Sequence, residues 1–274
     1  MSLLTDIKDS AQKNRTKIQS SEATNLEKIL NNTFYLPKRI KEETAFIKQV
    51  MTRGAETQER KGLHASELIK GDKDYCCRKQ VLSLVYKQLQ GEQIPIGLQK
   101  IFEEGNAVHE KWQRLFIRAG YSTANDLDVT QYNEKYMISF TPDIICEIPE
   151  FYKGKMVGEI KSVNTYQFQK MVKHPSASKQ LQFYMFLTGI HKGFVLSEDK
   201  NTQDIKLEVY DFDVDLVKKY IDRAEEIQVN YQKLLKAHKM VKRPKDAISP
   251  ECKRCAKCAL KNSCWNLQGG KQKL

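Results

Sequence analysis

The stretch "VGEIKSV", residues 157–163, decides how this sequence folds and where its chemistry lies. Its two valines and one isoleucine are typical of a buried β-strand, because β-branched residues pack well on a pleated surface. Side chains alternate across a strand, so Glu159 and Lys161 share one face while Ile160 points to the other. The stretch therefore places an acid beside an ammonium group in a run that otherwise suits a protein core.

The hydrophobic pattern on either side of this stretch predicts an α/β protein. Strands are expected at 126–134, 136–148, 156–163, 192–198 and 205–212, and helices at 78–89, 98–119, 165–173, 176–189 and 213–239. The 98–119 helix should carry one apolar face made of Ile101, Gly105, Val108, Trp112, Leu115 and Ala119. This order of elements predicts a mixed central sheet flanked by helices.

The chain divides by composition into two parts. Residues 1–62 are polar, mixed in charge and patchily helical in pattern, so we expect a helical N-terminal extension. Residues 63–270 should form the main domain, including a C-terminal cysteine cluster.

Charge and hydropathy restrict the class of protein. The net charge is +12, and residues 233–274 alone hold twelve basic and two acidic residues. Such a tail suits a polyanion, with nucleic acid first, although a solvated basic surface explains the charge equally well. No apolar run reaches the length of a membrane span, and the start lacks the layout of a secretion signal. We therefore expect a cytoplasmic protein with reduced thiols and no membrane partner.

A second carboxylate should lie close to the Glu159 side chain. Asp143 follows Pro142 in the preceding expected strand, and neighbouring strands would bring Asp143 and Glu159 together. Two close carboxylates repel each other, and a divalent cation such as Mg²⁺ relieves that repulsion. Lys161 would then orient water or stabilise charge on a phosphate. Taken alone, the set of Asp143, Glu159 and Lys161 is explained more simply as a cross-strand salt bridge on a solvated sheet face.

Two residue pairs on expected helices point toward the same place. Gly105 and His109 are four residues apart and stack on one helix face, which leaves room beside the imidazole. By itself, His109 would more often be a histidine at the edge of the core. Gln180 and Tyr184 are also four residues apart and would present an amide and a phenol to one ligand. Alternatively, they simply mark a helix boundary.

Six of the seven cysteines fall into two groups, which favours metal ligation over disulfides in a reduced compartment. The first group is Cys76 and Cys77. The second, "CKRCAKCALKNSCW", holds Cys252, Cys255, Cys258 and Cys264. On spacing alone, both zinc and an iron–sulfur cluster fit. Cys146 lies in an apolar run and suits a core position.

The motifs "GNAVH" (105–109), "TPD" (141–143), "GEIK" (158–161) and "QLQFY" (180–184) appear in order. Together they resemble the RecB-like branch of the PD-(D/E)xK nucleases, and most closely the CRISPR-associated and phage-encoded iron–sulfur exonucleases. The resemblance implies a restriction-endonuclease-like core. It implies that Mg²⁺ or Mn²⁺ binds His109, Asp143, Glu159 and the Ile160 carbonyl. Lys161 would position water, and Gln180 and Tyr184 would orient the scissile phosphate or the DNA strand.

The same resemblance assigns the cysteines. In these nucleases one cysteine precedes the core and three follow it, and "YCCRK" resembles their upstream motif. It implies a 4Fe–4S cluster on Cys76, Cys255, Cys258 and Cys264 that joins the two ends of the domain and stabilises it by closing a long loop. Cys77 and Cys252 are additional thiols, and a zinc site on the four C-terminal cysteines is the alternative.

The leading hypothesis is a metal-dependent DNA exonuclease acting on single strands or DNA ends, in a bacterial or phage-infected cell. Aromatic residues such as Tyr166, Phe168 and Tyr184 would stack on bases or equally belong to the core, and the core suits Phe168 better. The alternative is a non-catalytic DNA-binding subunit of a recombination complex, against which the complete motif set argues. A third hypothesis is a partner-dependent enzyme that trims DNA for CRISPR spacer acquisition. Homo-oligomers and recombination or CRISPR proteins are the expected protein partners.

Overall fold

The computed structural model describes residues 20–33, 42–47, 62–85, 96–174 and 176–266. The chain divides into two compact units. Unit 1 comprises Met1–Gln58, Gly97–Thr130 and Thr141–Val214, and unit 2 comprises Glu59–Ile96, Gln131–Phe140 and Asp215–Leu274. Each unit has its own mixed sheet, so the expected α/β class with mixed sheets and flanking helices is confirmed, with two sheets in place of one.

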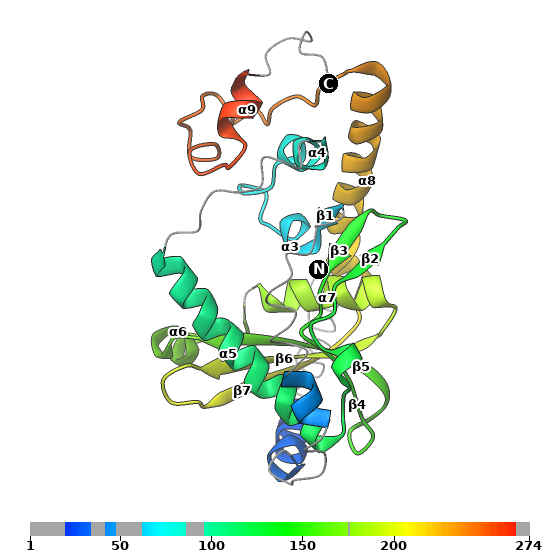
Figure 1. The fold of residues 1–274 in the computed structure, drawn as a ribbon, viewed down its shortest axis with the longest axis vertical. Helices are drawn as coiled ribbons and strands as arrows, with labels where there is room; N and C mark the ends of the chain where they lie inside the picture. Colours follow the sequence, from blue (N-terminus) through cyan, green and yellow to red (C-terminus); the bar gives the residue numbers. More distant parts are fainter. Residues whose placement is uncertain (1–19, 34–41, 48–61, 86–95, 175, 267–274) are drawn as a thin grey trace, which may run out of the picture. The chain divides into compact units, whose positions relative to one another are not determined.

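The sheet of unit 1 has the order β4-β5-β6-β7 (Figure 1). Its strands are β4 (Ile144–Ile148), β5 (Tyr152–Val163), β6 (Lys192–Asp199) and β7 (Ile205–Asp211). The pairs β4–β5 and β6–β7 are antiparallel, whereas β5 and β6 are parallel. The parallel pair needs a crossover, which α6 (Thr165–Lys170) and α7 (Ala177–Thr188) supply. Strand β5, which holds the opening stretch, is therefore an inner strand.

Helices cover both faces of this sheet. On one face, α5 (Ile96–Ala119) stacks the Phe116 ring on Phe194 of β6, with ring centroids 5.8 Å apart. On the other face, α7 packs so closely that a Cβ on Gly193 would meet Leu181 and Met185. Side chains alternate along β5, so Ile160 faces α5 while Glu159 and Lys161 face α7.

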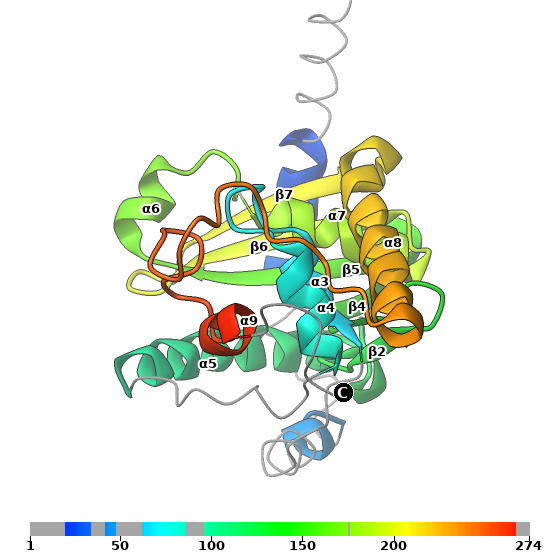
Figure 2. The same cartoon turned by 90° about the horizontal axis from the view of Figure 1, so that it is seen from above.

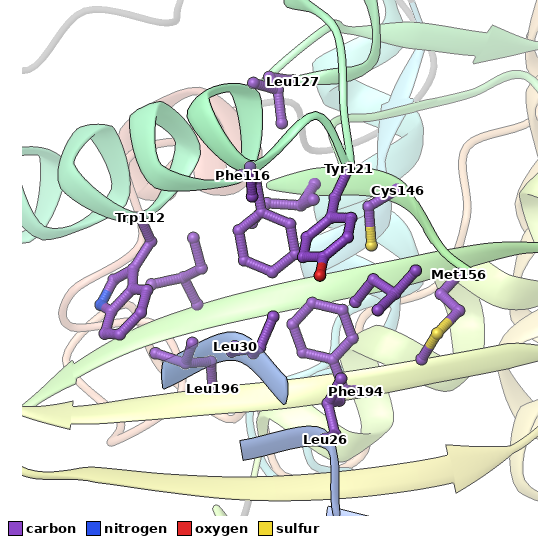
Figure 3. Close-up of a cluster of buried hydrophobic side chains, with 14 of the residues drawn as sticks. Leu26, Leu30, Trp112, Phe116, Tyr121, Leu127, Cys146, Met156, Phe194 and Leu196 are labelled. Atoms are coloured by element: carbon purple, nitrogen blue, oxygen red, sulfur yellow. The ribbon is translucent and has the colours of Figure 1, made fainter. Parts of the chain in front are cut away.

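The core of unit 1 lies between α5 and the sheet (Figure 3). Leu26 and Leu30, from the helical residues 20–33, and Phe46, from the helical residues 42–47, are fully buried in it. Glu43 also accepts hydrogen bonds from Arg114 and Arg118 of α5. The described residues before Leu63 include helices at 20–33 and 42–47, and both contribute directly to the core.

The described part of unit 2 contains a small sheet and several helices, one of them long (Figure 2). Its sheet has the order β1-β3-β2, built from β1 (Leu63–His64), β3 (Ile138–Phe140) and β2 (Gln131–Asn133). The helices are α3 (Ala65–Leu68), α4 (Cys77–Val85), α8 (Val214–Ala237) and α9 (Lys261–Asn266). No described helix is both long and apolar enough to cross a membrane.

The expected strand 136–148 is wrong as a single element. The chain leaves one sheet after Phe140 and enters the other at Ile144, with Pro142 between them. Proline has no backbone N–H to donate to a strand ladder, so the strand breaks there. The expected strand 126–134 is likewise reduced to β2, because Asp126 ends a 3₁₀ turn and Asp128 adopts a left-handed φ of 50°.

The helices are closer to expectation, with shifted ends. The 165–173 helix stops at Lys170, and the 176–189 helix ends where Gly189 adopts a left-handed φ of 70°. The 78–89 helix is described as far as Val85, and its remaining residues lie outside the described part. The predicted apolar face of α5 is wrong at Ile101, which is 57% exposed.

Candidate active site

Strands β4 and β5 bring the two predicted carboxylates together. Ile144 pairs with Gly158, so Asp143 lies next to Glu159 just beyond the end of β4. Strand β4 does not extend this far, and the Asp143 carboxylate instead accepts a hydrogen bond from the Ile160 N–H at 2.7 Å. The N–H and C=O of one strand residue point to the same side, so the Ile160 carbonyl lies on this edge too.

A chain of hydrogen bonds runs from the acidic pair to α7. The Lys161 ammonium donates to Glu159 and lies 3.5 Å from the Gln180 side-chain oxygen. The Gln180 amide in turn donates to the Tyr184 hydroxyl at 3.0 Å. The spacing of four residues places Gln180 and Tyr184 on one face of α7, as predicted. The structure therefore brings Glu159, Lys161, Gln180 and Tyr184 into one network.

Burial and charge strongly perturb these groups. Burial and the nearby Asp143 charge raise the pKa of Glu159 to about 7. Burial also opposes ionisation of Asp143, but the His109 hydrogen bond and charge hold the pKa of Asp143 below its usual value. Burial opposes the Lys161 charge, yet Glu159 and Asp143 raise the pKa of Lys161. The site thus keeps one carboxylate and one ammonium ionised, while the second carboxylate titrates near neutrality.

His109 joins the site from α5. Its Nδ1 lies 3.4 Å from Asp143 Oδ1. Burial alone would lower the pKa of the imidazole, but the hydrogen bond and charge of Asp143 outweigh it and raise that pKa. One turn earlier, a Cβ on Gly105 would meet no atom within 4 Å. Space therefore exists beside the histidine, although packing in the described part of the chain does not require glycine.

Two further residues belong to the site and were missed in the sequence. Gln113 is buried one turn after His109, and its amide donates to the Asp143 carbonyl at 2.9 Å. Gln113 lies four residues after His109, and this helical spacing could have identified it from the sequence. Ser197 pairs in register with Lys161 and is fully buried, with no partner for its hydroxyl in the described part of the chain. Only the pairing of β5 with β6 reveals Ser197.

The donor chemistry of the site suits a divalent cation. Two carboxylates and a backbone carbonyl are oxygen ligands of the kind that Mg²⁺ and Mn²⁺ prefer, and the imidazole adds one nitrogen donor. The buried Glu159 Oε2 has no hydrogen-bond partner among the described residues. As placed, however, no three His, Cys, Asp or Glu side chains in the described ranges stand close enough to hold one ion. The carboxylates instead contact Lys161 and His109, so their side chains would have to reorient.

A separate cavity in unit 2 gathers four cysteines. Its volume is about 410 Å³, and its lining includes Cys76, Cys255, Cys258 and Cys264. Cys77 and Cys252 are not among its described lining residues, and the Asn230 amide lies near the Cys77 sulfur, at 3.7 Å. The lining holds nine basic side chains against one acidic side chain, Asp74.

Hydrogen bonds join the two segments that carry these cysteines. Arg254 pairs with Asp246 at 2.8 Å and donates to the carbonyls of Asp72 and Tyr75. Cys76 follows directly, so its segment is attached to the C-terminal loop within unit 2. The lone Cys146 lies in the unit 1 core as expected, where burial raises the pKa of its thiol.

No protein-family model and no curated protein matches the chain. Among solved structures, an alkaline exonuclease from Laribacter hongkongensis is 16% identical, with a TM-score of 0.45 and a match over 65% of this chain and 93% of that one. A phage-related exonuclease from Haemophilus somnus 129PT is 17% identical, with a TM-score of 0.43 over 65% of this chain and 96% of that one. Likenesses of this size assign no function, which has to be inferred from the site.

Proposed function

We propose that unit 1 is a divalent-metal-dependent DNA exonuclease with a RecB-like PD-(D/E)xK site. One observation carries the proposal. Glu159 is fully buried with an unpartnered oxygen, its pKa is raised to about 7, and Asp143 and Lys161 lie beside it. Burying such a carboxylate costs stability, and functional sites are where such costs concentrate.

The metal ligands would be His109, Asp143, Glu159 and the Ile160 carbonyl. A divalent cation bound there would supply Lewis-acid stabilisation of the charge that builds on a phosphate. The Ile160 N–H fixes the Asp143 carboxylate, and the Gln113 amide fixes its backbone carbonyl. The Glu159 and His109 side chains would turn toward the cation.

The chain's own polar groups would position the phosphate and the water. Lys161 stays protonated, because Glu159 and Asp143 raise its pKa, so its ammonium can stabilise a phosphate oxygen or orient the attacking water. Burial and the Glu159 charge keep the Tyr184 pKa far above neutrality, so the phenol remains a hydrogen donor. Gln180 links the two and fixes their directions.

A polynucleotide is the substrate that the charge of the chain suits best. The net charge is +12, and an exposed aromatic ring, Tyr166, follows the catalytic strand with Lys170 3.8 Å from its centre. Aromatic rings beside cations bind single strands by stacking. Phe168, by contrast, is buried. Single-stranded DNA or DNA ends in recombination, repair or CRISPR processing remain the proposed substrates, with a homo-oligomer or partner proteins as the proposed assembly.

We also propose that Cys76, Cys255, Cys258 and Cys264 hold a 4Fe–4S cluster. These four cysteines line one cavity, whereas the two additional thiols do not. Zinc would need all four sulfurs about 2.3 Å from a single ion. The cavity that the four thiols line has a volume of about 410 Å³, which gives room for a group larger than one ion. The cluster would join the segment around Cys76 to the C-terminal loop.

Digestion of labelled DNA tests the proposed function. Single and double strands carrying a 5′ or a 3′ label are incubated with Mg²⁺ or Mn²⁺, and products are resolved by length. A metal-dependent exonuclease shortens the strand from an end, and it does so only in the presence of the metal ion. Binding without metal-dependent cleavage would instead support the alternative, a non-catalytic DNA-binding subunit.

A further inference from the structure

The cavity in unit 2 contains a buried arginine without an acidic partner. Arg78 is only 5% exposed, and its Nε donates to the Cys264 sulfur at 3.1 Å. Its remaining hydrogen bonds reach the backbone carbonyls of Val241 and Cys264. No ion pair in the described part of unit 2 includes Arg78, so its charge faces neutral oxygens and one thiol.

A second arginine and an indole repeat this pattern. The Arg243 guanidinium stacks on the Trp265 ring, 4.0 Å from its centre, and donates to the Cys264 carbonyl at 2.9 Å. Arg243 Nε is buried with no hydrogen-bond partner among the described residues, and the buried Trp265 indole N–H interacts with the Cys255 thiol. Both side chains line the cavity, and the indole lies beside Cys255.

These features are costly in a cavity with neutral contents. A buried guanidinium without a counter-charge destabilises the fold, and a buried N–H without an acceptor adds to that cost. An anion in the cavity removes both costs. Four thiolates around a doubly charged metal centre keep two negative charges, which two guanidinium groups balance.

We propose that Arg78, Arg243 and Trp265 supply the counter-charge and hydrogen bonds for an anionic metal–thiolate centre on the four cysteines. This inference rests on the proposed cofactor and extends it to residues outside the ligand set. The buried nitrogens lie against sulfur-bearing residues, so a thiolate centre suits them better than a nucleic-acid phosphate bound from solvent.

The arrangement has two consequences. Donors around a metal–thiolate centre hold its ligands, and removing one typically weakens metal retention by about 10-fold to 100-fold. Positive charge and hydrogen bonds to sulfur also favour the more negative, reduced form of an iron–sulfur cluster, so they raise its reduction potential.

Metal retention tests the proposal directly. The full chain is purified without oxygen, and iron, sulfide and zinc per chain are measured. The rate at which a chelator removes the metal is then compared for wild type, Arg78→Gln, Trp265→Phe and Lys245→Gln. Trp265→Phe keeps a ring for Arg243 to stack on and removes only the N–H, so it tests hydrogen bonding even if Arg78→Gln disturbs folding. Lys245 is exposed and does not line the cavity, so Lys245→Gln controls for charge alone.

We expect about 10-fold faster metal loss in Arg78→Gln and Trp265→Phe, with Lys245→Gln unchanged. If iron is bound, the potential of Trp265→Phe should also fall. Wild-type retention in both variants would overturn the role of these donors while leaving the cofactor in place. Bound zinc would refute the iron–sulfur assignment, and the donors would then be judged on zinc retention. A metal-free wild type, even after reconstitution, would overturn both proposals.

Discussion

Replacing Glu159 with glutamine should make the protein more stable and inactive at the same time. The buried carboxylate has a pKa raised from 4.5 to about 7, and one pKa unit corresponds to about 1.36 kcal/mol. Ionised Glu159 therefore costs up to about 3 kcal/mol of folding free energy above pH 7. Glutamine has nearly the same shape and no charge, so Glu159→Gln should recover about 2 to 3 kcal/mol at pH 8 without added metal.

The sign of this effect depends on pH. Below pH 4.5 the carboxyl is protonated in both the folded and the unfolded chain, so the substitution should change stability little. Between pH 4.5 and about 7 the unfolded chain loses its proton first, and wild-type stability falls as pH rises. The gain from glutamine should therefore grow across this range and then level off.

Urea unfolding at pH 5 and pH 8, followed by circular dichroism, measures the gain. Glu198→Gln is the matched control, since Glu198 is also buried but both its oxygens accept hydrogen bonds, from Lys111 and Trp112. That substitution should destabilise the protein by about 2 kcal/mol or more. The reasoning fails if Glu159→Gln is no more stable than wild type at pH 8, or if it retains cleavage.

Two other predictions concern the scaffold. Lys70 and Lys79 lower the pKa of Glu67 to about 2 against the opposing effect of burial, so its stabilisation is present above pH 4.5 and is lost as pH falls toward 2. Glu67→Gln should therefore lower the free energy of unfolding by about 1 to 2 kcal/mol at pH 7, a value discounted for the partial exposure of Glu67, and by almost nothing near pH 2. Urea titration at the two pH values measures this loss, and an equal loss at both would contradict the prediction. A Cβ at Gly158 would overlap the Phe194 ring, so Gly158→Ala should lower the thermal-unfolding free energy by about 1 to 3 kcal/mol, and an unchanged melting temperature would refute that packing.

The sequence predicted the centre of unit 1 well. Alternation along residues 157–163 was enough to place Glu159 and Lys161 on one face, and helical spacing placed Gln180 beside Tyr184. Strand alternation and helical spacing each depend on a single strand or helix, so the sequence of that element is sufficient to predict them. Asp143 followed from the assumption that adjacent strands pair, which the β4–β5 ladder confirms.

Longer-range features could not be predicted in the same way. The division into two sheets depends on where the chain goes after Pro142, and a local pattern does not specify that destination. The contact of Arg78 with Cys264 joins residues 186 positions apart, and Ser197 meets Lys161 only through parallel pairing. Such neighbours are set by tertiary packing, so sequence periodicity carries no signal for them.

We propose that Lys161 and its carboxylate neighbours hydrolyse DNA with a divalent cation. The most direct test of this proposal is the single-turnover cleavage rate of an end-labelled single strand with Mn²⁺, with binding of the same strand measured in parallel. Lys161→Ala should lower the cleavage rate by about 10²-fold to 10³-fold while leaving binding nearly unchanged. Lys153→Ala, which removes an exposed lysine from the same strand, should leave both at wild-type values. Cleavage by Lys161→Ala at the wild-type rate, or the absence of metal-dependent cleavage in wild type, would contradict the account.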